Sequence, residues 1–164
     1  MPRARSGVRA SARAVKQRRL TRLELHGNRL KGSLPSELGL AAYLTHLDLS
    51  ANQVEGRVLA ELGNLRNLAV LDLSENRLGG ALPARLRLLR KLRVLDLHGN
   101  GLSGPIPALL GELKALTCLN VADNRFTGEV PSEFGQLTNL VTLRLDGNDL
   151  RGPLPETLTA LDAL

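Results

Sequence analysis

Apolar and polar residues along this chain follow a pattern that recurs every 24 residues without insertion or deletion. In each unit a stretch of the form LxxLxL, such as Leu20–Leu25, ends in an apolar–polar alternation, which is the period of a half-buried strand. Periods of about 20 to 50 residues are typical of solenoids, in which each unit packs only against its neighbours. The pattern therefore predicts six stacked units, each with one short strand, whose strands form a parallel sheet along one face of a coil.

Polar and small residues mark the turns between the expected strands. Each unit places one asparagine after its strand: Asn28, Asn52, Asn76, Asn100, Asn124 and Asn148. An amide side chain carries both a donor and an acceptor, so we expect this structural column to bond backbone groups that the turn leaves unpaired. A glycine follows four positions later and a proline three positions after it, as at Gly104 and Pro107. This proline is expected to open a short helical or extended segment on the convex side.

The complete motif LxxLxLxxNxLxGxxP, as in Leu92–Pro107, resembles the plant-specific class of leucine-rich repeats (LRR). The resemblance covers residues 20–163 and implies an α/β solenoid, a right-handed horseshoe of six 24-residue repeats with a concave parallel β-sheet. It also implies a second, short set of strands near the GxxP segment. Repeat two carries Val58 and Leu59 where the pattern has Ile-Pro, so the pattern leaves the convex geometry of this repeat open, although not the coil. Leu164 begins an incomplete seventh repeat.

The net charge of +6 is concentrated at the N-terminus of the sequence. Residues 1–19 hold seven basic residues and no acid, whereas the remaining 145 residues hold 15 basic and 16 acidic residues. The repeats themselves therefore give no support to specific nucleic-acid binding. We interpret residues 1–19 as a basic tail or as a helix, N-capped by Ser11, that covers the edge of repeat one. An Arg-rich organelle transit peptide is the alternative.

Other sequence features bear on the compartment. No apolar run is long enough for a secretory signal or for a membrane span. The single cysteine, Cys118, has no partner for an internal disulfide, and no Asn-x-Ser/Thr glycosylation site occurs. These features favour a cytoplasmic location, with an organelle as the alternative.

Partner-binding residues are expected on the exposed strand positions, because the side chains at the other positions are expected to pack in the core. The column between the last two strand leucines reads Glu24, Asp48, Asp72, Asp96, Asn120 and Arg144. Four adjacent carboxylates repel one another, which raises their pKa values unless a cation or a basic partner neutralises them. The column is therefore either a stripe that accepts a basic peptide or polyamine, or simply the aspartate that is typical of the family.

The neighbouring column is apolar in its middle. It reads Arg22, His46, Val70, Val94, Cys118 and Thr142. Val70 and Val94 are expected to seat a small aliphatic side chain, with charged contacts at the rim. Because the face holds no aromatic residue, tight binding is not expected. The predicted partner-binding residues of the concave face are Arg22, Glu24, His46, Asp48, Val70, Asp72, Val94, Asp96 and Arg144.

The sequence predicts no catalytic, metal or cofactor site. His26, His46 and His98 lie in different repeats, and Cys118 is three expected strands from His46, roughly 14 Å away. No cluster of cysteine or histidine shows ligand spacing. The basic run from Arg85 to Arg93 is interpreted as a solvated convex face, with docking on an acidic surface as the alternative.

The repeats predict a non-catalytic interaction module that binds a protein or peptide, with a basic partner as one option, in signalling or as a scaffold. A second hypothesis rests on the absence of terminal caps and on the resemblance. It makes the chain a fragment or shortened relative of a larger LRR receptor-like kinase, receptor-like protein or LRR GTPase whose catalytic domain is absent. An inhibitor of secreted cell-wall-degrading enzymes ranks last, because signal and cap cysteines are missing.

Overall fold

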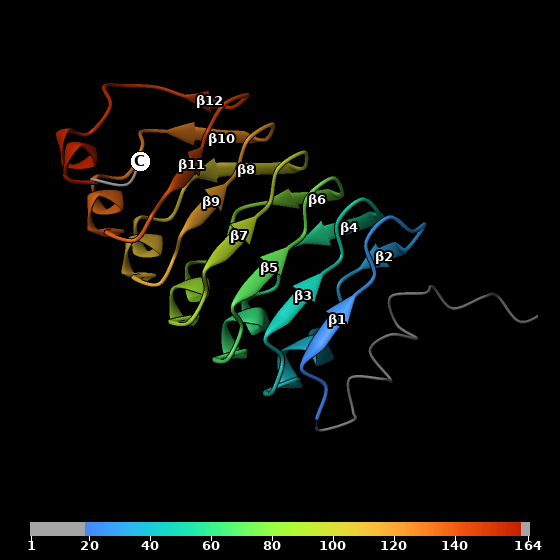
Figure 1. Ribbon diagram of the computed structural model, residues 1–164. Helices are drawn as coiled ribbons and strands as arrows, with labels where there is room; N and C mark the ends of the chain where they lie inside the picture. The colour runs from blue at the N-terminus through green and yellow to red at the C-terminus, as the bar shows by residue number, and fades with distance from the viewer. Residues whose placement is uncertain (1–18, 162–164) are drawn as a thin grey trace, which may run out of the picture.

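The computed structural model describes residues 19–161 as six stacked coils whose strands lie in two parallel sheets (Figure 1). The coils follow one another along a curved array, from the first repeat in blue to the last in red. The expected tail or capping helix falls on residues 1–19, of which only Arg19 is among the described residues, and Leu164 also lies outside them. The six expected units are all present.

The first sheet contains the predicted strands, one from each repeat. Its members are β1 (Arg22–Glu24), β3 (His46–Asp48), β5 (Val70–Asp72), β7 (Val94–Asp96), β9 (Cys118–Asn120) and β11 (Thr142–Arg144). The middle residue of each strand turns inward, and Leu47 and Leu71 are fully buried. Neighbouring strands pair in parallel with a shift of one whole repeat, so that Leu47 lies opposite Leu71. The sequence columns therefore become continuous rows on the outer surface of this sheet, which is the concave face.

The second sheet confirms the short strands expected near the GxxP segment. Its members are β2 (Lys31–Ser33), β4 (Gln53–Arg57), β6 (Arg77–Gly80), β8 (Gly101–Pro105), β10 (Arg125–Gly128) and β12 (Asp149–Leu150). The glycines of the first five repeats lie in these strands for a backbone reason. Gly56 has φ +88°, and a Cβ added there would meet Ser33 Cβ at 3.1 Å. Glycine adopts this left-handed conformation without strain.

The third side of each coil is a short 3₁₀-helix. These helices are η1 (Ser36–Leu40), η2 (Ala60–Asn64), η3 (Ala84–Leu88), η4 (Ala108–Glu112), η5 (Ser132–Gln136) and η6 (Glu156–Ala160). Five of them follow a proline, but η2 follows Leu59, whose φ of −79° and ψ of 136° match the extended backbone of Pro35. Repeat two therefore has the same convex geometry as repeat one, because the position requires extended backbone, which leucine also adopts.

Leucine packing fills the space between the two sheets and the 3₁₀-helices. Most leucines of the inner repeats are fully buried, and Phe126 and Phe134 take leucine positions with no exposure. Burial of apolar surface is the main favourable term for such a coil. Tyr43, by contrast, is 59% exposed just after η1.

Candidate functional site

The concave face carries the two predicted columns side by side along the first sheet. Strand pairing places Val70 opposite Val94 and Asp72 opposite both Asp48 and Asp96. The outermost members, which are Arg22, Glu24, Thr142 and Arg144, are exposed. The inner members are half-buried, apart from buried Asn120. The predicted residues therefore form one continuous surface whose middle is the least exposed to water.

The aspartates of repeats two and three are held by a serine two residues further along. Asp48 Oδ1 accepts hydrogen bonds from Ser50 N at 2.9 Å and from Ser50 Oγ at 2.6 Å. Asp72 Oδ1 accepts the same pair from Ser74, at 3.0 and 2.6 Å. One oxygen of each carboxylate is thus fixed by its own strand end. The other oxygen remains to meet neighbouring groups, such as His26 Nδ1, which lies 3.4 Å from Asp48 Oδ2.

Burial raises the pKa of the Asp72 carboxyl above its ordinary value of 3.8. The hydrogen bonds from Ser74 oppose this effect, and the charges of Asp96 and Asp48 add to it. The sequence predicts repulsion between carboxylates as the cause of raised pKa values along this column. At Asp72 repulsion contributes, but burial is the larger cause.

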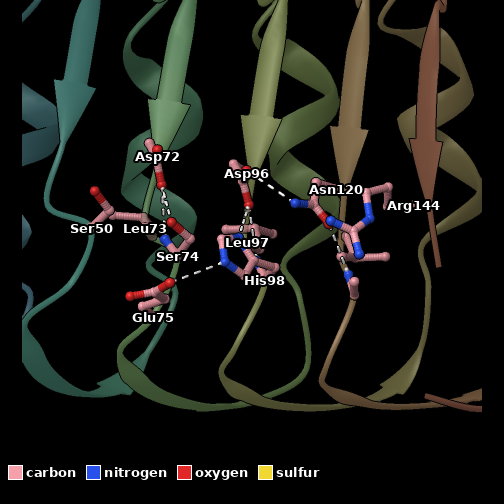
Figure 2. A network of polar contacts seen from close by, with 12 residues as sticks. Ser50, Asp72, Leu73, Ser74, Glu75, Asp96, Leu97, His98, Asn120 and Arg144 are labelled. Atoms are coloured by element: carbon pink, nitrogen blue, oxygen red, sulfur yellow. Dashed lines mark hydrogen bonds and ion pairs between the residues drawn. The ribbon is translucent and has the colours of Figure 1, made fainter. Parts of the chain in front are cut away.

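A histidine between two carboxylates lies just beyond the C-terminal end of β7, in the fourth of the six repeats (Figure 2). His98 Nδ1 lies 2.8 Å from Asp96 Oδ1, and His98 Nε2 lies 3.5 Å from Glu75 Oε1. The second oxygen of Asp96 accepts a hydrogen bond from Asn120 Nδ2 at 3.1 Å. The hydrogen bond to Asp96 is the main reason why the pKa of His98 is raised from 6.5, and Glu75 adds to it. Four polar groups from three consecutive repeats are thus joined.

The grouping around His98 is not among the sequence predictions, because the three histidines lie in separate repeats and bring no nucleophile and base together. One feature of the sequence could have predicted it. His98 lies two residues after Asp96, at the repeat position that Ser50 and Ser74 occupy in repeats two and three. Because adjacent repeats lie side by side, a residue that is remote in sequence, such as Glu75, reaches the same point on the face.

Both ends of the charged column carry their own ion pairs. Arg22 pairs with Glu24 in β1. Arg144 Nη2 lies 2.9 Å from Asp146 Oδ2, and this hydrogen bond lowers the pKa of Asp146. The concave face is therefore acidic in its middle and close to neutral at its two ends.

The apolar part of the face consists of half-buried Val70 and Val94 with Cys118 in the next strand. Burial raises the pKa of the Cys118 thiol, and the charges of Asp96 and Asp72 add to this effect. His46 lies in β3, three strands away from Cys118, and its Nδ1 is 2.9 Å from Thr45 Oγ1. The face therefore brings an aliphatic pair together with carboxylates, and it keeps the thiol apart from His46.

Within residues 19–161, no group of three or more His, Cys, Asp or Glu is arranged to hold a metal ion. In the same part of the chain, no helix is long and apolar enough to cross a membrane.

The basic run from Arg85 to Arg93, most of which lies in repeat three, is bonded to neighbouring repeats. Arg90 Nη1 donates to Glu112 O at 2.8 Å, and its Nη2 lies 2.6 Å from Glu112 Oε2. Arg87 Nη1 joins the same carboxylate at 3.3 Å, and Lys91 Nζ donates to Asn67 Oδ1 at 2.8 Å. These cations stabilise neighbouring repeats, which makes the run a poor candidate for a free docking surface.

A family model described as Leucine Rich Repeat matches six segments, at residues 19–40, 43–65, 67–89, 91–113, 115–137 and 139–161. No curated protein matches the chain in sequence. Among solved structures, the chain is similar to the plant peptide hormone receptor RGFR1 in complex with RGF2, at 36% identity and a TM-score of 0.92. The similarity covers 93% of this chain and 24% of that one.

Two further structures come from Arabidopsis receptors. The chain is 38% identical to the receptor kinase HAESA in complex with the peptide hormone IDA and the co-receptor SERK1, with a TM-score of 0.90. It is 35% identical to the LRR ectodomain of the plant membrane receptor kinase GASSHO1/SCHENGEN3 in complex with CASPARIAN STRIP INTEGRITY FACTOR 2, with a TM-score of 0.83. Each similarity covers 93% of this chain, and 26% and 21% of those chains respectively. The chain thus spans about a quarter of the length of these relatives.

The cytoplasmic location favoured by the sequence is wrong. The neighbours are plant receptors and include the LRR ectodomain of a membrane receptor kinase, which points to an extracellular location instead. A lone cysteine does not fix the compartment of this fold. Leucine packing fills the described coil, so the absence of a disulfide does not indicate a reducing compartment.

Proposed function

Because the chain belongs to the leucine-rich repeat family, we propose that it is a non-catalytic module that binds a peptide or protein on its concave face. The neighbours in complex with peptide hormones support a ligand of this kind. The proposed module comprises residues 20–163, with residues 1–19 as a basic tail or capping helix. No catalytic role is assigned to its residues.

One observation carries the proposal: an acidic row, in which Asp72 keeps one carboxylate oxygen without a hydrogen bond from the described residues, runs beside an aliphatic pair. Ser74 occupies Oδ1 of Asp72, while no hydrogen bond to its Oδ2 is found among residues 19–161. Val70 and Val94 stand two residues earlier on the same and the adjacent strand. This combination suits a Lys or Arg side chain, whose charged head meets carboxylate oxygen while its apolar stem covers the valines.

We infer a basic peptide as partner and assign nine residues to the contact surface. These are Arg22, Glu24, His46, Asp48, Val70, Asp72, Val94, Asp96 and Arg144. The half-buried central residues are the proposed anchors, because desolvated central contacts dominate binding energy whereas rim charges mainly affect the association rate.

The experiment measures binding of two synthetic decapeptides, one alternating Gly and Arg and one alternating Gly and Glu, to the native chain by calorimetry. We expect the native chain to bind the Arg peptide. A triple variant with Asp48→Asn, Asp72→Asn and Asp96→Asn should lose roughly tenfold in affinity, since each contact between a carboxylate and a cation is worth about 0.5 kcal/mol. Asparagine fits this column, because Asn120 occupies it in repeat five.

A matched control neutralises three exposed glutamates on the 3₁₀-helices, with Glu37→Gln, Glu61→Gln and Glu133→Gln. It makes the same change in net charge away from the concave face. Equal losses in both triple variants, or Arg-peptide binding that survives the aspartate triple, would exclude the concave row as the site. Preference of the native chain for the Glu peptide would exclude a basic partner.

A second candidate function rests on how little of the related receptors this chain spans. The chain spans about a quarter of the peptide-hormone receptors, so it also fits part of an ectodomain. In that case repeats beyond this chain contribute to the ligand contacts. A longer transcript or protein product that contains the chain would support this candidate, and a single product near 17.7 kDa would argue against it.

A further inference from the structure

The four residues Glu75, Asp96, His98 and Asn120, which we call the His98 cluster, join repeats three, four and five on the concave face. In repeats two and three, the residue that bonds the column aspartate is a serine, which has no charge to change. Repeat four replaces that serine with an imidazole. This replacement puts a titratable group in contact with two carboxylates, one of which, Asp96, belongs to the proposed binding row.

We propose that the His98 cluster makes the concave face pH-sensitive: the protonated imidazole pairs with Glu75 and Asp96 and offsets one of their two negative charges, and its deprotonation makes that charge available to a cationic partner. This inference rests on the proposed function, because it takes the cationic partner from there. It adds a condition under which that partner binds.

Geometry supports two states of the cluster. A protonated imidazole donates from both ring nitrogens, so it satisfies Asp96 Oδ1 at 2.8 Å and Glu75 Oε1 at 3.5 Å together. A neutral imidazole has a single N–H, so one of the two carboxylates then faces a ring lone pair. The backbone around the ring is fixed, because His98 N donates to Asp96 Oδ1 at 3.1 Å and His98 O accepts from Glu75 N at 2.8 Å. Protonation therefore changes charge on an already ordered surface.

The surroundings of the cluster are mainly acidic. The titratable and charged groups on the elements packed around it are Asp72 and Glu75 from repeat three, Asp96 from repeat four, Cys118 and Asp123 from repeat five, and Arg144 from repeat six. Arg144 is bonded to Asp146 and so is already paired. The acidic surroundings favour the protonated imidazole at mildly acidic pH.

The sign of the effect on stability follows from linkage. The folded pKa of His98 is raised above its ordinary value of 6.5, so the stabilisation by the cluster is complete below about pH 6.5. It is lost as pH rises through the folded pKa. Over the same range the concave face becomes more negative, so its affinity for a cationic peptide should increase.

The test compares the native chain with His98→Ser, which gives repeat four the serine of repeats two and three and keeps a donor for Asp96. We first measure urea unfolding of both chains from about pH 5.5 to about pH 8.5. The native chain should lose stability relative to His98→Ser as pH rises. His26→Gln and His46→Gln serve as controls, because they remove the other two histidines. Parallel pH profiles of the native chain and His98→Ser would overturn the structural half of the inference.

The second measurement is binding of the alternating Gly–Arg decapeptide over the same pH range. The affinity of the native chain should rise by roughly two- to fivefold, whereas that of His98→Ser should stay nearly constant. Glu75→Gln should reduce the rise without abolishing it. The same rise in the native chain and in His98→Ser would overturn the proposed role in ligand binding.

The two measurements separate this inference from the proposed function. If the native chain binds the peptide at no pH, the basic-partner function fails and the ligand half of this inference fails with it. Binding without any pH dependence due to His98 leaves the proposed function intact and overturns the inference alone. If His98→Ser does not fold, NMR titration of the His98 ring in the native chain and in Asp96→Asn replaces it. A ring pKa that is unchanged by Asp96→Asn would contradict the cluster.

Discussion

Asn76 binds the backbone of the preceding repeat at Val54: its Oδ1 accepts a hydrogen bond from Val54 N at 2.9 Å. Its Nδ2 donates to Leu49 O of the same preceding repeat at 2.9 Å, and also to Leu73 O and Ser74 O within its own turn. The side chain is 9% exposed. One amide thus satisfies backbone groups of two successive coils, which makes it both a turn residue and a link between repeats.

This link predicts a large cost for Asn76→Ala. The substitution leaves Val54 N and Leu49 O without their partner in a buried site, so we expect a loss of about 3 kcal/mol in the free energy of unfolding. Urea denaturation provides the measurement. The matched control is Asn28→Ala in repeat one, where the exposed side chain donates, within residues 19–161, only to Leu25 O and His26 O. Equal losses at the two positions would mean that the link between repeats adds nothing.

Close approach of successive 3₁₀-helices predicts a steric penalty at Gly63. A Cβ at this position would lie 2.5 Å from Arg85 O and 2.9 Å from Arg85 Cγ. Gly63→Ala should therefore destabilise the chain by about 2 kcal/mol, because η2 and η3 must move apart. The control is Gly79→Ala, whose added methyl would meet only Gly101 O at 3.5 Å and should cost less than about 1 kcal/mol. A control that is as destabilising as Gly63→Ala would contradict the steric explanation.

The sequence predicted the repetitive part of the fold because each coil obeys local rules. The LxxLxL stretch defines the strands of the first sheet, and the proline defines where the 3₁₀-helix begins. Leu59 shows the limit of motif matching: the position requires a backbone conformation, and the sequence motif records only the residue that favours it most. Features shared by all repeats are therefore readable from one repeat.

The contacts of the candidate site depend on neighbours one repeat away. The sequence places Asp96 on the concave face, but it does not show that His98 and Asn120 occupy both of its oxygens. The same holds for Arg90, which reads as a solvated cation and instead donates to the next repeat. These contacts depend on whether a side chain is long enough to touch the next repeat and on which residue it meets there. The repeat pattern gives neither.

Long basic side chains bond the ends of successive 3₁₀-helices, which predicts a stabilising role for Arg90. It donates to the carbonyl of Glu112, the last residue of η4, as Arg66 does to Leu88 in η3 and Lys114 to Gln136 in η5. Arg90→Ala should cost about 1 kcal/mol, because the site is partly exposed to water. Arg93→Ala, which removes an exposed cation of the following repeat, is the control. Unfolding curves that coincide for the two variants would show that loss of charge alone explains the effect.

Burial of Asp72 predicts that stability depends on pH in a direction opposite to that of most carboxylates. Its folded pKa is raised above 3.8, so between 3.8 and that raised value the folded chain binds more protons than the unfolded chain. The contribution of Asp72 to stability is therefore present below about pH 3.8 and is lost as pH rises through the folded pKa. At neutral pH the ionised carboxylate reduces the stability of the fold.

Asp72→Asn should consequently stabilise the chain at about pH 7, by less than about 1 kcal/mol because water still reaches the group. The gain should vanish near pH 3. The amide oxygen keeps an acceptor for Ser74, as Asn120 Oδ1 does for Ala122 N at 3.2 Å. Asp146→Asn is the control of opposite sign: its pKa is lowered by Arg144, so its contribution is present above about pH 3.8 and is lost as pH falls. Urea unfolding of both variants at several pH values measures the difference. If the Asp72→Asn chain is less stable than the native chain at neutral pH, contacts other than those of Ser74 compensate the charge of Asp72.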